Sequence, residues 1–169
     1  MEELDLNSVS DRDYNHVYAS ASSGDIEAQN KLGCMYRDGD RVEQDGNKAV
    51  EWLTKAANQG STIAKFNLGY MYKDGDGIPL NYSKAIEWFT LAADEGDLDS
   101  LVWLGLLHER GHGFPKDPSK AVEYYSIAAA KGDSYGQNNL GNSYRRGTGV
   151  PKDEKKSHRM VIKVCSTGK

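Results

Sequence analysis

Three features of this chain have residue types and spacings that could support chemistry. Residues 74–77 read Asp-Gly-Asp-Gly, and a glycine-rich loop can cradle a phosphate while paired carboxylates can bind a metal ion. His108 and His112 are four residues apart, a spacing at which two imidazoles on one helix face could hold a metal. Cys34 is a potential nucleophile. Each of these features also has a purely structural explanation.

The sequence around these residues argues against the chemical roles. A calcium loop starting at residue 74 would need oxygen ligands at its fifth and twelfth positions, which hold Ile78 and Ala85. A dinucleotide fingerprint would need a preceding strand and a third glycine, and both are missing from the pattern. Residues 108–112 read His-Glu-Arg-Gly-His and match the letters of an HExxH motif. Such a motif needs both histidines on one helix face, and Gly111 is expected to end the helix between them. We therefore expect no catalytic residue, no metal and no cofactor.

A 36-residue repeat explains the positions of the glycines better. Leu-Gly pairs recur at residues 32–33, 68–69, 104–105 and 140–141, and Ala-Ala-x-x-Gly ends at residues 60, 96 and 132. A further glycine keeps the same register at residues 39, 75, 111 and 147. The three loops equivalent to 74–79 all retain this glycine, whereas the two acids are kept at 38–43 and lost at 110–115 and 146–151. The pattern therefore predicts four repeated units, and a turn between helices at residues 74–77.

Each unit has the pattern of two helices. In the second unit, Ser61 can cap a helix that Gly75 ends, and Asn81 can cap a helix that ends at Gly96. The expected apolar faces repeat at helical spacing. Their residues in this unit are Ala64, Leu68, Gly69 and Tyr72, followed by Ala85, Trp88, Phe89, Ala92 and Ala93. The equivalent caps of the other units are Asp25, Asp45, Asp97, Asp117, Asp133 and Asp153.

The full pattern, A-x-x-x-L-G-x-x-Y-x-x-G-x-G-x-x-x-[DN]-x-x-K-A-x-x-W-[FYL]-x-x-A-A-x-x-G, resembles the Sel-1-like repeat family, relatives of tetratricopeptide repeats. The match covers residues 25–168. It implies an all-α fold, a right-handed superhelical solenoid of antiparallel helix pairs, used to bind proteins. One bacterial branch of the family joins each repeat by paired cysteines, and this chain lacks them. The expected organisation is an N-terminal tail and capping helix at 1–24, repeats at 25–60, 61–96 and 97–132, and a fourth repeat at 133–169.

The two ends of the array are expected to differ from its middle. Residues 12–24 align with the second helix of a repeat, with Tyr14, Val17 and Ala21 at its apolar positions. Such a half-repeat helix could cover the open end of the stack. At the other end a degenerate capping helix replaces the usual aromatic and alanine pairs. Its apolar residues are Met160, Val161, Val164 and Cys165, with Ile162 at a position that is polar in the other repeats.

The resemblance to tetratricopeptide repeats implies that the first helix of each pair lines a concave groove. A stripe beside its core face is then the candidate partner-binding surface, and it is apolar and aromatic in the middle of the chain. Its residues are Ile63, Phe66, Tyr70, Lys73, Asp99, Val102, Leu106, Glu109, Asn138 and Asn142. The alternative is that neighbouring repeats bury Phe66, Tyr70 and Leu106. Trp103 is either a binding anchor or a packing residue.

Charge is distributed unevenly along the chain. Residues 1–40 hold nine acids and three bases, a net charge of −6, whereas residues 145–169 hold eight bases and two acids, a net charge of +6. A basic patch could therefore bind an acidic partner or a phosphate backbone, or could simply be a solvated helix face. Its residues are Arg145, Arg146, Lys155, Lys156 and Arg159. Opposite charge at the two ends also allows self-association.

These observations favour a non-catalytic adaptor that binds a protein or peptide. The net charge of −4 argues against general nucleic-acid binding. No apolar run approaches the roughly 20 residues of a membrane helix, and the acidic N-terminus does not resemble a secretory signal, so we expect a cytoplasmic protein with no membrane partner. The alternatives are an effector or regulator that acts on a host or foreign protein, or a binder of acidic partners or nucleic acid through the basic end.

Overall fold

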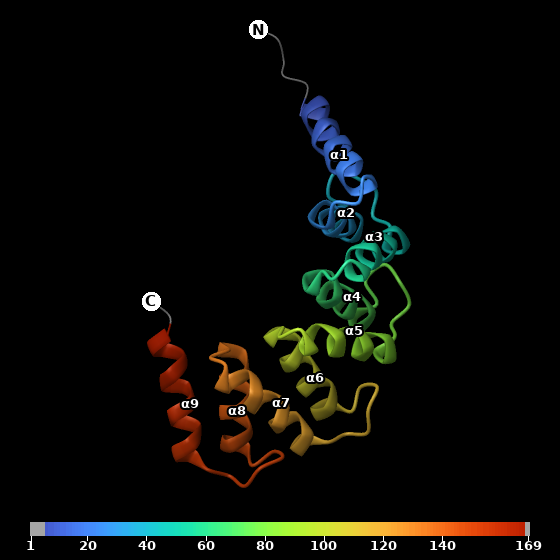
Figure 1. Cartoon of the computed structure of the whole chain (residues 1–169). Coiled ribbons are helices and arrows are strands. Elements are labelled where there is room, and N and C mark those ends of the chain that lie inside the picture. The colour runs from blue at the N-terminus through green and yellow to red at the C-terminus, as the bar shows by residue number, and fades with distance from the viewer. Residues whose placement is uncertain (1–5, 168–169) are drawn as a thin grey trace. The chain divides into compact units, whose positions relative to one another are not determined.

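The described part of the chain consists of helices joined by short loops. The structure is a computed structural model, which describes the backbone of residues 6–167 and the side chains of residues 13–160. Within these residues it has nine α-helices and no strand (Figure 1). The helices are α1 (Leu6–Ser22), α2 (Ile26–Asp38), α3 (Gly46–Asn58), α4 (Thr62–Asp74), α5 (Tyr82–Asp94), α6 (Leu98–Arg110), α7 (Pro118–Ala130), α8 (Ser134–Arg146) and α9 (Glu154–Thr167). None of the described helices is long and apolar enough to cross a membrane.

Local capping explains where the helices begin. The carboxylate of Asp25 accepts a hydrogen bond from the backbone N–H of Ala28 at the start of α2. Ser61 makes the equivalent bond to Ala64 at the start of α4. The helices α3, α5, α6, α7, α8 and α9 begin in the same way, with caps at Asp45, Asn81, Asp97, Asp117, Asp133 and Asp153. Each cap pairs a backbone donor that the first helical turn leaves free. All eight caps were predicted from the sequence.

The Asp-Gly-Asp-Gly segment is a turn, as predicted. Gly75 has a φ of 71° and donates its backbone N–H to the carbonyl of Met71, which closes α4 in the left-handed conformation that favours glycine. The carboxylate of Asp74 pairs with Lys73 on the same helix. The Gly77 carbonyl lies so close to Gly46 that a Cβ added at residue 46 would be 2.3 Å from the oxygen. Gly75 therefore allows the left-handed backbone that ends α4, and Gly46 allows its backbone to lie against that of Gly77.

The chain divides into two compact units, and the first comprises residues 1–85. Its core lies between α1, α2, α3 and α4, where Leu32, Leu53 and Leu68 are fully buried. Helices α2 and α3 approach closely because residue 33 is glycine. A Cβ there would be 2.6 Å from Cγ of Leu53. The Leu-Gly pair of the repeat therefore supplies one buried side chain and one site of close helix contact.

The second unit comprises residues 86–169, with its core between α6, α7, α8 and α9. Tyr125 on α7 is fully buried, and a Cβ at Gly105 on α6 would be 2.5 Å from its ring. Trp103 stacks on Phe89, with ring centroids 6.3 Å apart and planes 11° apart. Of the α5 residues of this unit that were predicted to face the core, Phe89 and Ala92 are fully buried, whereas Trp88 and Ala93 are only partly buried. Ala85, at the end of the first unit, is also fully buried.

The end helices pack as the repeat pattern predicts, as far as their side chains are described. Val17 and Ala21 of α1 are buried, and the Tyr14 and Tyr36 hydroxyls are hydrogen-bonded at 2.9 Å. The helix begins at Leu6, earlier than the expected residue 12. Met160 of α9 packs against the core of the second unit. The predictions for the side chains of Val161, Ile162, Val164 and Cys165 cannot be compared, because these side chains lie outside the described ones. Residues 1–5 of the expected tail also lie outside the described residues.

Candidate functional site

In the first unit, the predicted stripe forms a continuous row on α4. Ile63 is 65% exposed, and Phe66 and Tyr70 are half-buried with ring centroids 6.3 Å apart. The Lys73 ammonium lies over the Tyr70 ring, 4.4 Å from its centroid. The row is therefore amphipathic: it begins with an open apolar side chain and ends with a cation held on an aromatic ring. A partner could reach Ile63 without displacing core residues.

Beside this row, an amide network connects α2 to α4. The Asn67 amide donates to Oδ1 of Asn30 at 3.1 Å and lies 3.5 Å from Sγ of Cys34. Arg37 donates to Oδ1 of Asn67 at 3.5 Å. Burial raises the pKa of the Cys34 thiol, so this cysteine stays protonated near neutral pH and is a poor nucleophile. Asn67 joins this surface although it lies outside the predicted stripe.

In the second unit, the structure separates the predicted residues of α6. Asp99 is exposed and Leu106 and Glu109 are half-buried, but Val102 is only 6% exposed. Val102 belongs to the hydrophobic core with Leu101 and Val122. Its expected place on the open surface was therefore wrong, because the core of this unit covers the valine that replaces Phe66 of the previous repeat. Asn138 and Asn142 of α8 are exposed and half-buried, respectively.

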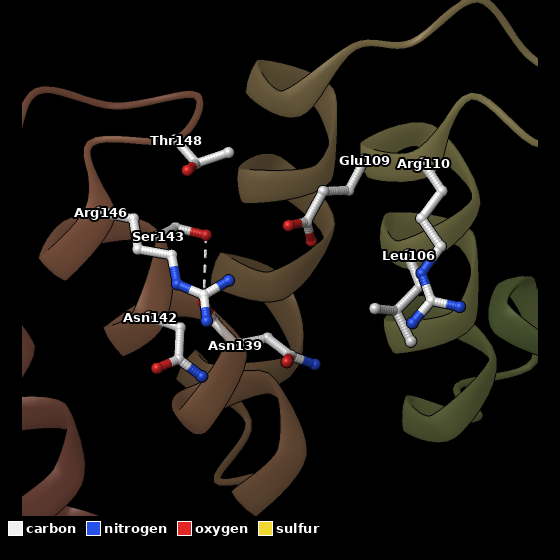
Figure 2. Close-up of a pocket in the computed structure, with 8 residues that line it drawn as sticks. All are labelled: Leu106, Glu109, Arg110, Asn139, Asn142, Ser143, Arg146 and Thr148. Atoms are coloured by element: carbon white, nitrogen blue, oxygen red, sulfur yellow. Dashed lines mark hydrogen bonds between the residues drawn. The ribbon is translucent and has the colours of Figure 1, made fainter.

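A cavity of about 200 Å³ lies between α6 and α8 (Figure 2). Its walls are formed by Leu106, Glu109 and Arg110 from α6, by Asn139, Asn142, Ser143 and Arg146 from α8, and by Thr148 from the following loop. Figure 2 shows Arg110 beside Leu106 on one wall and Arg146 on the other, with the Glu109 carboxylate between them. The cavity thus brings together three residues of the predicted stripe and one of the predicted basic patch.

Two polar groups of the cavity are held by neighbouring side chains. The Tyr125 hydroxyl donates to Oε2 of Glu109 at 2.7 Å, and burial together with this bond raises the pKa of Tyr125 far above its usual value. Arg145 donates to Oδ1 of Asn142 at 2.8 Å. In contrast, neither Arg110 nor Arg146 has an acidic group within ion-pair distance among the side chains that the structure describes. Both guanidinium groups remain available to a ligand.

Sequence reasoning missed four of the cavity residues. They are Arg110, Asn139, Ser143 and Thr148. A comparison between repeats would have found Arg110. Its equivalents one and two repeats earlier are Asp74 and Asp38, and its equivalent one repeat later is Arg146. The reversal of charge at this position halfway along the chain is a signal in the sequence itself.

The predicted basic patch is exposed, although neighbouring acids offset part of its charge. Lys156 lies 3.9 Å from Asp153, and Lys152 lies 2.9 Å from Glu154. Such exposed pairs contribute little to stability, but they reduce the local field. Lys155 and Arg159 are exposed on α9. Arg145 and Arg146 lie on α8, and of the patch only Arg146 lines the cavity.

The histidines are placed for packing. The ring of His108 stacks on Phe114 with centroids 3.8 Å apart, and it lies 5.6 Å from the ring of Tyr124. Burial lowers the pKa of His108. Gly111 ends α6 between His108 and His112, as the sequence predicted. Within the described residues, no three His, Cys, Asp or Glu side chains are grouped so that they could hold a metal ion.

Comparisons with known proteins agree with the repeat and the fold. The family model of the Sel1 repeat matches residues 26–61, 62–97, 98–133 and 134–163. A solved Sel1 repeat protein from Oxalobacter formigenes is 32% identical, with a TM-score of 0.83 over 92% of this chain and 62% of that one. A protective antigen of uropathogenic Escherichia coli with an SLR fold is 31% identical, with a TM-score of 0.83 over 92% of this chain.

A third solved structure is more distant. Helicobacter pylori cysteine rich protein B is 27% identical, with a TM-score of 0.57 over 73% of this chain and 88% of that one. No curated protein matches. This chain spans 33% of the E. coli antigen and 62% of the Oxalobacter protein. The matches confirm the all-helical, solenoid-type repeat fold that the sequence predicted.

Proposed function

Because this chain belongs to the Sel1 repeat family, we propose that it is a non-catalytic scaffold that binds a segment of a partner protein. The partner would contact the first helices of the repeats, which in the first unit are α2 and α4. The observation that carries this proposal is the row on α4, where an exposed isoleucine precedes two half-buried aromatic rings. Exposed apolar side chains beside polar ones are typical of protein-binding surfaces.

The distribution of burial supports this assignment. The alanines of the second helices, such as Ala56, Ala92 and Ala128, are fully buried and fill the core. The first helices bury their Leu-Gly pairs but leave the adjacent stripe partly accessible, with Ile63, Leu106 and Asn142 on it. One side of each first helix is thus committed to packing, and another remains available for a partner.

The proposal is tested by charge substitutions on this row. We expect Ile63→Glu/Tyr70→Glu to lose a protein partner that wild type retains from a lysate of the source cells. The matched control is Leu91→Glu, since Leu91 is 47% exposed but lies on a second helix, α5. Circular dichroism should show that each variant stays folded. A folded double variant that retains every partner of the wild type would refute the proposed surface.

The similarity to the E. coli protective antigen favours a second candidate, an effector or regulator that acts on a host or foreign protein. Such a protein would use the same surface on a partner outside its own cell. Fractionation of the source cells distinguishes the two candidates. A partner and a chain that both reside in the cytoplasm support an internal adaptor, whereas recovery of the chain outside the cell supports an effector.

A further inference from the structure

We propose that the cavity between α6 and α8 binds the acidic side chain of a partner segment, with Arg110 and Arg146 as its two charged walls. This inference rests on the proposed function and adds the chemistry of the partner. The two guanidinium groups, on neighbouring first helices, lack an acidic partner among the described side chains. Guanidinium groups present several donors in a plane and bind carboxylates strongly.

The equivalent position of the first unit shows the opposite arrangement. There, Arg37 and Lys73 are each followed by an aspartate, and Arg37 pairs with Asp38 at 2.7 Å. The first unit therefore neutralises its own cations at the ends of α2 and α4. In the second unit, arginines replace both aspartates, at residues 110 and 146. At the ends of its first helices, the first unit thus has cations paired with the following aspartates, whereas the second unit has Arg110 and Arg146 without an acidic partner among the described side chains.

The charge of the cavity matches a single carboxylate. Two arginines and the Glu109 carboxylate give a net charge of +1 for its lining, and the Tyr125 hydroxyl keeps Glu109 in place. A monoanion would neutralise this charge, whereas a dianionic phosphate would leave an excess negative charge. The amides of Asn139 and Asn142 can donate further hydrogen bonds to a carboxylate.

The size of the cavity matches a side chain. At about 200 Å³ it is smaller than the roughly 300–1,000 Å³ of pockets that enclose drug-sized ligands. It has room for a glutamate or aspartate side chain and the water around it. Leu106 lies on the cavity wall and offers an apolar contact to a neighbouring side chain of the partner. A polyanion such as RNA fits less well, because the chain has 25 acidic against 21 basic residues.

The test begins with peptides selected from a randomised phage library on the full chain. We expect the enriched sequences to contain aspartate or glutamate. Synthetic versions with acetylated and amidated ends, carrying a fluorophore, then measure affinity by anisotropy. Replacing the peptide's acid by its amide, or introducing Arg110→Gln or Arg146→Gln, should weaken binding by about 10- to 100-fold. The loss of affinity from the peptide's amide and the loss from an arginine substitution should be non-additive, since both changes remove the same interaction.

Control variants separate this inference from the proposed function. Lys131→Gln removes an exposed positive charge outside the cavity and should leave the affinity unchanged. Arg110→Asp/Arg146→Asp restores at these two positions the aspartates that the first unit has at residues 38 and 74, and it should abolish the preference for acids. Both arginines are exposed, so these variants should fold.

The outcomes against the inference are distinct. Enriched peptides without acids, whose binding depends on Ile63 and Tyr70 but not on the arginines, would overturn the carboxylate site while the scaffold stands. Binding that requires a free C-terminus or a phosphoserine in the peptide would also overturn it. Failure of the wild type to enrich any peptide would count against both proposals.

Discussion

Gly105→Ala tests the close contact of α6 with α7. A Cβ at residue 105 would lie 2.5, 2.8 and 3.1 Å from three ring atoms of Tyr125. The ring is fully buried, and its hydroxyl is anchored on Glu109 at 2.7 Å. The ring therefore cannot move aside without losing a hydrogen bond or opening the core.

The expected magnitude combines two opposing effects. Overpacking a core typically costs about 1–3 kcal/mol, and the rigid ring places this site near the upper end. Alanine gains about 1 kcal/mol over glycine in a helix interior. We therefore expect Gly105→Ala to lower the free energy of unfolding by about 2 kcal/mol. The assay is urea unfolding followed by circular dichroism, with midpoint and slope compared with those of wild type.

A double-mutant cycle isolates the cause. In Tyr125→Phe the ring loses its anchor on Glu109 and can shift, so adding Gly105→Ala should cost less in that background than in wild type. Two results would refute the reasoning. One is a Gly105→Ala variant as stable as wild type or more stable. The other is an equal cost of the substitution in both backgrounds.

Two further perturbations test other contacts. Burial lowers the pKa of His108 in the folded chain, so the unfolded state takes up the proton more readily. The contribution of neutral His108 to the free energy of unfolding should be fully present above the pKa of the unfolded state, about 6.5, and should fall as the pH drops below that value. In His108→Phe that loss should shrink, and an unchanged pH dependence of the urea midpoint would contradict this. Gly46→Ala would place a Cβ 2.3 Å from the backbone oxygen of Gly77, which cannot rotate away as a side chain could. We expect a lower melting temperature in this variant than in Gly33→Ala, whose Cβ meets the movable side chain of Leu53, and the reverse order would contradict the backbone contact.

The periodicity of the sequence alone was sufficient to predict the repeats, the caps and the Asp-Gly-Asp-Gly turn. These features depend on local interactions. Asp25 caps α2 through a bond three residues away, and Gly75 ends α4 through its own backbone. The 36-residue spacing repeats each cap and the glycine that closes each first helix four times, which separates these signals from chance matches. Ser61 and Asn81 were identifiable as caps for the same reason.

Only the tertiary structure decided which side chains of the first helices remain accessible. Ile63 and Val102 belong to the same predicted stripe, yet one is 65% exposed and the other 6%. Helical spacing places a residue on a face, but its exposure depends on whether side chains of neighbouring helices cover that face, as the core with Val122 covers Val102. The cavity with Arg110 and Arg146 likewise exists only because α6 and α8 lie side by side. Contacts between residues 36 positions apart depend on how the helices pack, and no local pattern encodes that packing.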